Sequence, residues 1–389
     1  MLDIAADLHR WCREGRDFAV ATVVAVSGSA PRQPGAALAV DTEGAVVGSV
    51  SGGCVEGAVH DLCLEALRTG GTVRERFGCS DEDAFATGLT CGGVLDVLVS
   101  PVRAADPARP VAAAAVAAAA RGEAVAVVRV TAGPAALLGR ALLVRPGGGR
   151  TGTLGGAPVR DGEALDRTAA RTARAMLDTG RTGAVTLGAD GGRCGRPLEL
   201  LVEVALPPAR MIVFGAVDFA AALARVGTFL GYRVTVCDAR PVFATRERFP
   251  EADEVVTAWP HRYLETTGVD GRTVLCVLTH DAKFDVPLLC RALRLPVAYV
   301  GAMGSRRTHL DRLERLREAG VTESELARLR SPIGLDLGAR TPEETALSIA
   351  AEIVADRRGG SGVPLTGAHT PIHRDGQSPS RRGRFGSVV

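Results

Sequence analysis

The first two hundred residues contain the same succession of sequence blocks twice, about a hundred residues apart. Four blocks match in order and spacing, with one residue missing from the third: 18–24 with 123–129, 37–40 with 141–144, 48–54 with 152–157, and 91–99 with 194–202. A repeat of this length predicts two copies of one supersecondary unit. We expect each copy to contain a strand, a loop, a strand, a short strand, a helix and a final strand.

The helix of each copy is predicted from apolar residues spaced three or four apart. These residues are Val55, Val59, Leu62, Cys63 and Leu67 in the first copy, and Leu165, Ala169, Ala173 and Leu177 in the second. The copies differ where chemistry would take place, because Ala157 stands in the second copy where Cys54 stands in the first. We interpret the first copy as active and the second as structural, with one site built between them as the alternative.

After Pro207 and Pro208 the pattern changes to strands that alternate with helices. Short apolar strands are expected at 210–214, 233–237, 273–278 and 296–300, with a helix over 219–230. This alternation predicts an α/β fold with a Rossmann-like, doubly wound parallel sheet behind a duplicated α+β N-terminal half. The expected domains are 1–105, 106–206 and 207–357, followed by a disordered tail over 358–389 that is rich in Gly, Pro, Ser and Arg.

Composition excludes several classes of function. The formal net charge of +2 argues against a nucleic-acid-binding protein, which needs a concentrated basic face. The most apolar segment, 111–120, is far shorter than the roughly 20 residues that span a bilayer, and the first residues do not resemble a signal peptide. Nine cysteines, an odd number, fit a reducing cytoplasm better than a disulfide framework. We therefore expect a cytoplasmic protein without nucleic-acid or membrane partners.

A glycine-rich loop of the first copy holds the sharpest candidate site. Ser51, Gly52 and Gly53 lead into Cys54, where a helix is expected to begin, and Glu56 lies in its first turn. Free N–H groups at a helix N-terminus attract anions and lower the pKa of a nearby thiol. Cys54 is thus predicted to face a ligand, either as a soft-metal ligand or as a sulfur acceptor. The alternative is a small buried cysteine.

Two further segments of the first copy carry similar features. Cys91, Gly92 and Gly93 form a second cysteine-containing glycine loop, and Arg32 and Gln33 lie between two prolines. Arginine can bind phosphate through two parallel hydrogen bonds, so this segment is a candidate phosphate contact, with a solvated loop arginine as the alternative. Five other cysteines are expected to fill cores: Cys12, Cys63, Cys237, Cys276 and Cys290.

The second half offers candidate contacts beyond the carboxyl ends of its strands, where open α/β sheets bind ligands. Gly215 opens a dinucleotide-type loop, and Asp238 ends the next strand as a candidate ribose-binding acid. Val217 and Asp218 occupy the position of the second glycine and the residue after it, so we predict weak NAD(P) binding.

Two more loops of this half follow predicted strands. His280 and Asp281 are candidate acid/base residues, with a helix N-cap as the alternative for Asp281. Gly301 and Gly304 lie in a second candidate anion-binding loop, which opens a helix.

At segments 28–32, 48–56, 279–281, 299–307 and 331–344 the chain resembles the XdhC/CoxI family of xanthine dehydrogenase accessory proteins. The resemblance spans roughly residues 1–105 and 205–355 and implies a Rossmann-like C-terminal half. It also implies binding of molybdenum cofactor (molybdopterin) and insertion of its sulfurated form into xanthine dehydrogenase-type or carbon monoxide dehydrogenase-type enzymes. Cys54 and the glycines of its loop are carried over as cofactor contacts. The family's usual Gly-Ala-Gly-His loop is altered here at Val217 and Asp218.

We therefore expect a maturation factor in which Cys54 contacts molybdenum or relays sulfur, Cys91 assists, and Arg32 with the loop amides holds the cofactor's phosphate. One alternative is an NAD(P)-dependent oxidoreductase with His280 as proton donor. Another is a scaffold that joins a cysteine desulfurase to the target enzyme. A homodimer is left open.

Overall fold

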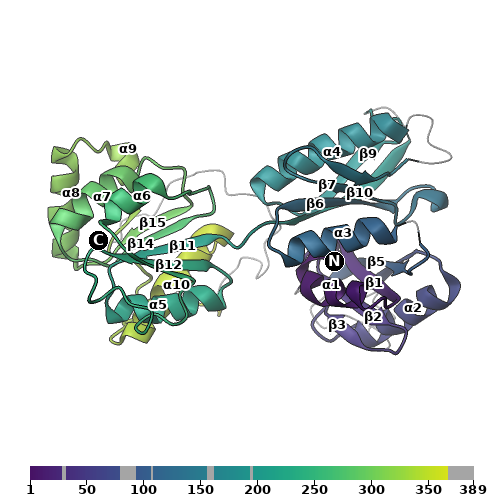
Figure 1. The fold of residues 1–389 in the computed structure, drawn as a ribbon, viewed down its shortest axis with the longest axis horizontal. Helices are drawn as coiled ribbons and strands as arrows, with labels where there is room; N and C mark the ends of the chain where they lie inside the picture. The colour runs from purple at the N-terminus through teal and green to yellow at the C-terminus, as the bar shows by residue number, and fades with distance from the viewer. Residues whose placement is uncertain (29–31, 79–92, 107, 156–161, 193–195, 367–389) are drawn as a thin grey trace. The chain divides into compact units, whose positions relative to one another are not determined.

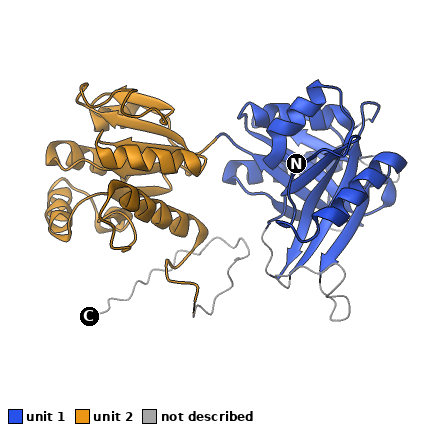
Figure 2. Ribbon diagram, turned by 90° about the horizontal axis from the view of Figure 1, so that it is seen from below, with its two compact units in different colours: residues 1–207, 370–375 blue, residues 208–369, 376–389 orange. Residues whose placement is uncertain are grey.

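The computed structural model describes residues 1–28, 32–78, 93–106, 108–155, 162–192 and 196–366. These residues divide after Pro207 into two compact units, which Figure 2 shows in separate colours. Unit 1 contains two antiparallel five-stranded sheets, and unit 2 contains one parallel six-stranded sheet.

Unit 1 is a structural duplicate, as its sequence repeat predicts. The first copy consists of η1 (Leu2–Ile4), α1 (Ala5–Arg13), β1 (Phe18–Ser27), β2 (Ala37–Asp41), β3 (Val46–Gly48), α2 (Glu56–Thr69), β4 (Val73–Gly78) and β5 (Val94–Val102). The second consists of α3 (Arg109–Ala120), β6 (Val125–Ala132), η2 (Ala135–Leu137), β7 (Ala141–Val144), β8 (Arg150–Gly152), α4 (Gly162–Thr179), β9 (Gly183–Gly188) and β10 (Pro197–Ala205). The strand orders, β3-β2-β1-β5-β4 and β8-β7-β6-β10-β9, are equivalent, which confirms the duplication. The expected match of Cys91 with Cys194 lies outside the described residues.

Each copy contains one strand that the sequence pattern did not predict, β4 in the first and β9 in the second. β4 is an edge strand with three consecutive charged residues, a composition that is unusual for a strand but typical of protected edges. Its arginines are held across the sheet, since Arg74 and Arg76 bind Asp96 of β5 at 2.6 and 2.7 Å. Tertiary ion pairs therefore stabilise a segment whose intrinsic strand preference is low.

The two sheets of unit 1 enclose a layer formed by α1 and α3 (Figure 1). Successive residues of a strand point to opposite faces, and β1 is buried on both. Phe18 and Val20 face the α1–α3 layer, whereas Ala19 and Ala21 face α2. The second sheet is covered in the same way by the α1–α3 layer and by α4. Each sheet thus needs the shared helical layer to bury one of its faces.

Unit 2 is a doubly wound sheet of the Rossmann type. Its elements are β11 (Arg210–Phe214), α5 (Asp218–Phe229), β12 (Arg233–Asp238), β13 (Glu254–Thr257), α6 (Pro260–Thr266), β14 (Val274–Val277), α7 (Ala282–Ala292), β15 (Tyr299–Ala302), α8 (Arg306–Glu318), α9 (Glu323–Leu326), β16 (Leu329–Arg330) and α10 (Pro342–Arg358). The strand order β13-β12-β11-β14-β15-β16 reverses between β11 and β14, which is where such sheets bind ligands. One face packs on α5 and α10, the other on α6, α7 and α8.

One boundary of unit 2 differs from its prediction in a way that affects a candidate residue. The strand expected over 296–300 is β15, which runs to Ala302 and therefore contains Gly301. Gly301 pairs with Cys276 of β14 and Arg330 of β16, and a Cβ there would lie 2.5 Å from the Ile333 side chain. Gly301 thus permits close packing inside the sheet.

In the described part of the chain, no helix is long and apolar enough to cross a membrane.

Candidate functional site

The loop between β3 and α2 is organised around one carboxylate, that of Glu56. Its two oxygens accept five backbone N–H groups, at 2.8–3.3 Å, and two hydroxyl groups. The donors are the N–H groups of Val50, Ser51, Gly52, Gly53 and Val55 and the hydroxyls of Ser49 and Ser51. The backbone has turned these amides toward one point, as in an anion-binding nest, and the chain itself supplies the anion.

This arrangement changes the role that the sequence suggested for the loop. Gly52 and Gly53 were expected to offer their N–H groups to a bound anion, but both N–H groups donate to Glu56 instead. Burial opposes ionisation of Glu56, yet the hydrogen bonds, led by those from Ser51, lower its pKa to about 2. Glu56 is therefore charged at neutral pH and fixes the loop backbone.

Cys54 lies at the outer side of this loop. It is exposed and precedes α2 by two residues. Its backbone N–H donates to the buried Ser51 hydroxyl at 3.0 Å, so the position of the thiol is set by the same network that Glu56 organises. The alternative of a small buried cysteine is wrong for Cys54. Among the described residues, no three His, Cys, Asp or Glu side chains are grouped to hold a metal ion.

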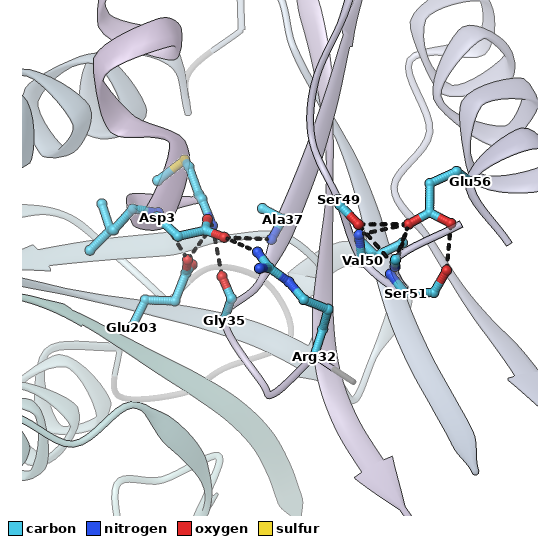
Figure 3. Close-up of polar contacts among 12 residues, drawn as sticks. Asp3, Arg32, Gly35, Ala37, Ser49, Val50, Ser51, Glu56 and Glu203 are labelled. Carbon is cyan, nitrogen blue, oxygen red and sulfur yellow. Dashed lines mark hydrogen bonds and ion pairs between the residues drawn. The ribbon is translucent and has the colours of Figure 1, made fainter. Parts of the chain in front are cut away.

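The Arg32 segment is connected to this loop through a single residue, Ala37. Arg32 bonds to Asp3 at 3.1 Å, and the same Asp3 oxygen accepts the N–H of Ala37 at 3.1 Å. The carbonyl oxygen of Ala37 in turn accepts the N–H of Ser49 at 2.9 Å. Figure 3 shows Ala37 between Asp3, to which the Arg32 guanidinium bonds, and the Ser49–Glu56 cluster. Two motifs that the sequence singled out separately thus belong to one region of the first copy.

Asp3 also connects this region to a buried ion pair at the N-terminus. The Met1 α-ammonium group lies 3.5 Å from Asp3 and donates to Glu203 at 2.5 Å (Figure 3). Because Glu203 belongs to β10, this contact joins the second copy to the first. Sequence reasoning missed it, since no local pattern links residues two hundred positions apart.

The second copy keeps a simpler form of the Glu56 arrangement. Buried Asp166 on α4 accepts the N–H of Leu154 at 2.8 Å, just as Glu56 accepts that of the equivalent Val50 at 3.3 Å. A helix carboxylate therefore anchors the loop in both copies. The first copy adds to this the serines, the glycine pair and Cys54.

In unit 2 the loops after β11 and β14 meet at the point where the strand order reverses. Gly215 has φ +107°, and a Cβ there would lie 3.0–3.1 Å from Thr279, so only glycine fits without strain. Asp238, the candidate ribose ligand, is already bonded within the protein: it accepts the N–H of Ala216 at 2.8 Å and pairs with Arg240 at 2.8 Å. Asp218 is exposed and pairs with Arg248 at 3.3 Å.

His280 and Asp281 follow β14 and are both exposed. Asp281 is the N-cap of α7, where it accepts the N–H of Lys283 at 3.1 Å, so the alternative role predicted for it is the observed one. The loop before α8 contains Gly304, whose φ is +153°, and the helix is capped by Ser305. Gly304 and the buried Gly301 therefore do not form one open loop.

A buried ion pair near this point was not predicted. Asp285 and Arg312 are each 4% exposed and bond at 2.9 Å, and Asp285 also accepts the hydroxyl of Thr279. Arg312 donates further to the Met303 carbonyl at 2.8 Å and the Ser331 hydroxyl at 2.9 Å. The pair thus ties together the segments that follow β14, β15 and β16.

The other candidate residues lie in the first copy of unit 1, and the expected core cysteines lie in both units. Gln33 is in the described part of the β1–β2 loop, Gly93 is buried directly before β5, and Cys91 and Gly92 lie outside the described residues. Three of the expected core cysteines are buried, and burial raises the pKa of Cys63 and Cys237 to about 12 and that of Cys276 still further. Cys12 and Cys290 are partly exposed.

Each unit contains a segment that matches a known protein family. Residues 11–78 match the XdhC and CoxI family, and residues 211–353 match the XdhC Rossmann domain, so that the two matches together span more than half of the chain. The chain belongs to the XdhC and CoxI family. The first match includes the Cys54 loop with Glu56, and the second includes both sides of the reversal point of the parallel sheet.

Among curated XdhC relatives, a Bacillus subtilis protein named as a probable xanthine dehydrogenase subunit is 27% identical over 87% of this chain and 93% of its own length. The "Molybdenum cofactor insertion chaperone PaoD" of Escherichia coli is 27% identical over 88% of this chain and 84% of its own. The uncharacterized protein YqeB of Escherichia coli is 30% identical, and the match covers 60% of this chain and 43% of YqeB. A crystal structure described as a xanthine dehydrogenase from Bacillus halodurans shares the fold, with a TM-score of 0.68 and 23% identity over 93% of this chain and 98% of that one.

Proposed function

We propose that this protein is a maturation factor that binds molybdenum cofactor, protects it during sulfuration and delivers it to a xanthine dehydrogenase-type or carbon monoxide dehydrogenase-type apo-enzyme. The names of two relatives support a role of this kind, because one is called a molybdenum cofactor insertion chaperone and another a probable xanthine dehydrogenase subunit. A cysteine desulfurase as sulfur donor, a homodimeric state and a cytoplasmic location stay predictions.

The observation that carries the proposal is the exposed Cys54 on a loop whose backbone is fixed from within. When bound, the cofactor supplies a soft metal, and thiolate is the protein ligand that such a metal prefers. Glu56 and Ser51 hold the backbone on both sides of Cys54, so the thiol is presented without an ordering step. Cys54 would contact the metal or relay sulfur, and the residues present fit that task.

The sequence suggested two contacts for the phosphate of the cofactor, the loop amides and Arg32, and we retain only Arg32. Because Glu56 already accepts the N–H groups of Ser51, Gly52 and Gly53, a second anion placed there would meet a carboxylate. Arg32 is the better candidate, since it is 41% exposed and its Nε is buried without a hydrogen-bond partner among the described residues. Its guanidinium is oriented by Asp3 and lies in the same region as the Cys54 loop.

The test compares the wild type with Cys54→Ser, each purified from a host that makes molybdenum cofactor and analysed for bound molybdenum and pterin. We expect Cys54→Ser to keep its fold and to lose cofactor retention, or activation of a client apo-enzyme, at least tenfold, which corresponds to about 1.4 kcal/mol. Cys290→Ser, which changes a partly exposed cysteine of unit 2, is the matched control and should behave as the wild type. Unchanged retention and activation in Cys54→Ser would refute the assignment of this thiol.

A nicotinamide-dependent oxidoreductase is the alternative that the sequence left open, and unit 2 gives it little support. The Asp238 carboxylate that a ribose would need is occupied by Ala216 and Arg240. Val217 and Asp218 stand where a pyrophosphate would approach the start of α5.

A further inference from the structure

The second copy of unit 1 contains a cavity with a chemistry of its own. The cavity has a volume of about 390 Å³ and lies between the β7–β8 hairpin and α4, the helix that covers the second sheet in Figure 1. Its polar lining consists mainly of four arginines, Arg150, Arg167, Arg171 and Arg174, together with Thr168. We refer to it as the arginine cleft.

The positive charge of the cleft is only partly neutralised. Glu163 is the one carboxylate that pairs with these arginines among the described residues, at 2.8 Å from Arg150 and 3.7 Å from Arg167. Arg171 donates to the neutral hydroxyl of Thr168 at 3.4 Å, and Arg174 forms no ion pair within the described part of the chain. Buried Asp166 adds a weaker electrostatic interaction with Arg150, so the four guanidinium groups are incompletely neutralised.

The spacing of these arginines lowers the stability of α4, and the packing of the helix does not require it. Arg167, Arg171 and Arg174 are four and three positions apart, so they share one face of α4, and like charges at this spacing destabilise a helix. The equivalent helix of the first copy provides an internal comparison. The exposed face of α2 carries Asp61, Glu65 and Arg68, and Arg68 pairs with Glu65 at 2.6 Å.

The exposed helix face is thus net negative in the first copy, with two carboxylates and one arginine, and net positive in the second, with three arginines against Glu163 and Asp178. A local arrangement that lowers stability without a packing gain points to function. Gly148, at the edge of the cleft, has φ +86° because it lies in the β7–β8 hairpin turn, and Gly44 of the first copy has a similar φ of +84°.

We propose that the arginine cleft binds a small phosphate-bearing anion, of the pyrophosphate or phosphate-ester class. Arginine matches the oxygens of phosphate with paired N–H donors, and several arginines favour a multivalent anion over chloride or a single carboxylate. The volume is within the range of small-molecule sites, and the apolar residues Val144, Ala164 and Ala170 give room for an organic group. The second copy, which the sequence suggested was only structural, then has a binding role separate from that of Cys54.

The probes for this proposal are inorganic pyrophosphate and ADP, titrated calorimetrically into the full-length protein at constant ionic strength. We expect pyrophosphate to bind the wild type, and the double variant Arg171→Gln/Arg174→Gln to bind it at least tenfold more weakly. Both arginines are exposed, so the variant should fold, and without ligand it should melt no lower than the wild type because a repulsion has been removed. Arg68→Gln, which removes an exposed arginine from the equivalent helix, is the matched control and should bind as the wild type.

The outcomes separate the possible ligands. Tighter binding of ADP than of pyrophosphate would identify an organic phosphate, whereas equal binding would identify the diphosphate group itself as the ligand. Equal affinity of the wild type and the double variant, or no binding of either probe, would overturn the proposal. Binding of hexaglutamate but not of pyrophosphate would also overturn it, because the cleft would then be a docking surface for an acidic peptide. Cys54→Ser should bind pyrophosphate as the wild type does, so that this proposal and the cofactor proposal can fail independently.

Discussion

Replacement of Glu56 by glutamine tests whether an internal carboxylate holds the Cys54 loop. The amide would keep the shape of the side chain, but it would turn an NH₂ group toward donors that now point at a carboxylate. A pKa of about 2, against an ordinary value of 4.5, corresponds to about 3 kcal/mol of preference for the charged form. Because solvent screens a partly exposed group, we expect Glu56→Gln to lower the free energy of unfolding of unit 1 by about 1–2 kcal/mol at neutral pH.

The pH dependence of this loss has a definite sign. The folded-state pKa of Glu56 lies below the unfolded value, so its carboxylate stabilises the fold above about pH 4.5 and this contribution is lost as the pH falls toward 2. The difference between wild type and Glu56→Gln should therefore be nearly the same at pH 7.0 and pH 4.5. It should fall to less than half at pH 3.0.

Urea unfolding followed by Trp11 fluorescence is a suitable assay, since Trp11 is buried in unit 1. The measurements are made in a Trp259→Phe background, which removes the other tryptophan and leaves Trp11 to report on unit 1 alone. Glu65→Gln on the same helix is the control, because Glu65 is exposed and pairs only with Arg68 there; this variant should unfold as the wild type does.

Two results would contradict this reasoning. A stability difference that stays constant from pH 7.0 to pH 3.0 would mean that the charge of Glu56 does not contribute. An equal loss in Glu65→Gln would mean that α2 responds to any loss of negative charge, for instance through its dipole.

Three further predictions concern unit 2. Asp285→Asn should lower its free energy of unfolding by about 3–5 kcal/mol, because Arg312 is left buried without its partner, and Asp285→Leu/Arg312→Met should recover part of this loss in a denaturant double-mutant cycle. Gly215→Ala should cost about 1–3 kcal/mol in thermal unfolding, since φ is +107° and Thr279 lies 3.0 Å from the added Cβ, whereas Gly268→Ala, with open space around it, should not. Calorimetric titration with NAD and NADP should show no micromolar affinity, because Val217 crowds and Asp218 repels a pyrophosphate, and micromolar binding would bring the oxidoreductase hypothesis forward.

The candidate site shows where sequence reasoning reaches its limit. The glycine pair and the helix start, both local features of the chain, favoured a ligand-facing Cys54 over a small buried cysteine; Cys54 is exposed, and its contact with a ligand stays a prediction. The same features suggested that the loop amides are open to an anion. They are closed by Glu56, and only the folded loop shows that five N–H groups converge on one side chain.

The boundary of β15 and the two missed edge strands have a related cause. Gly301 looks like a loop residue, and β4 contains Arg74, Glu75 and Arg76, so their intrinsic preferences argue against strand. Contacts with neighbouring strands hold both segments in their sheets. Gly301 pairs with Cys276 and Arg330, and Asp96 binds the arginines of β4. Long-range pairing decides such segments, and it leaves no local pattern.

The sequence by itself determined the duplication of unit 1, the Rossmann-type sheet of unit 2 and the family to which the chain belongs, because all three are written in the order and spacing of residues. Tertiary structure alone decided which polar groups are already paired. Asp238 with Arg240, Asp285 with Arg312, and Glu203 with the Met1 ammonium group are ion pairs of this kind. It also decided that four arginines of the second copy surround one cavity. Electrostatic interactions depend on distance in space and on burial, and the chain order of a sequence contains neither.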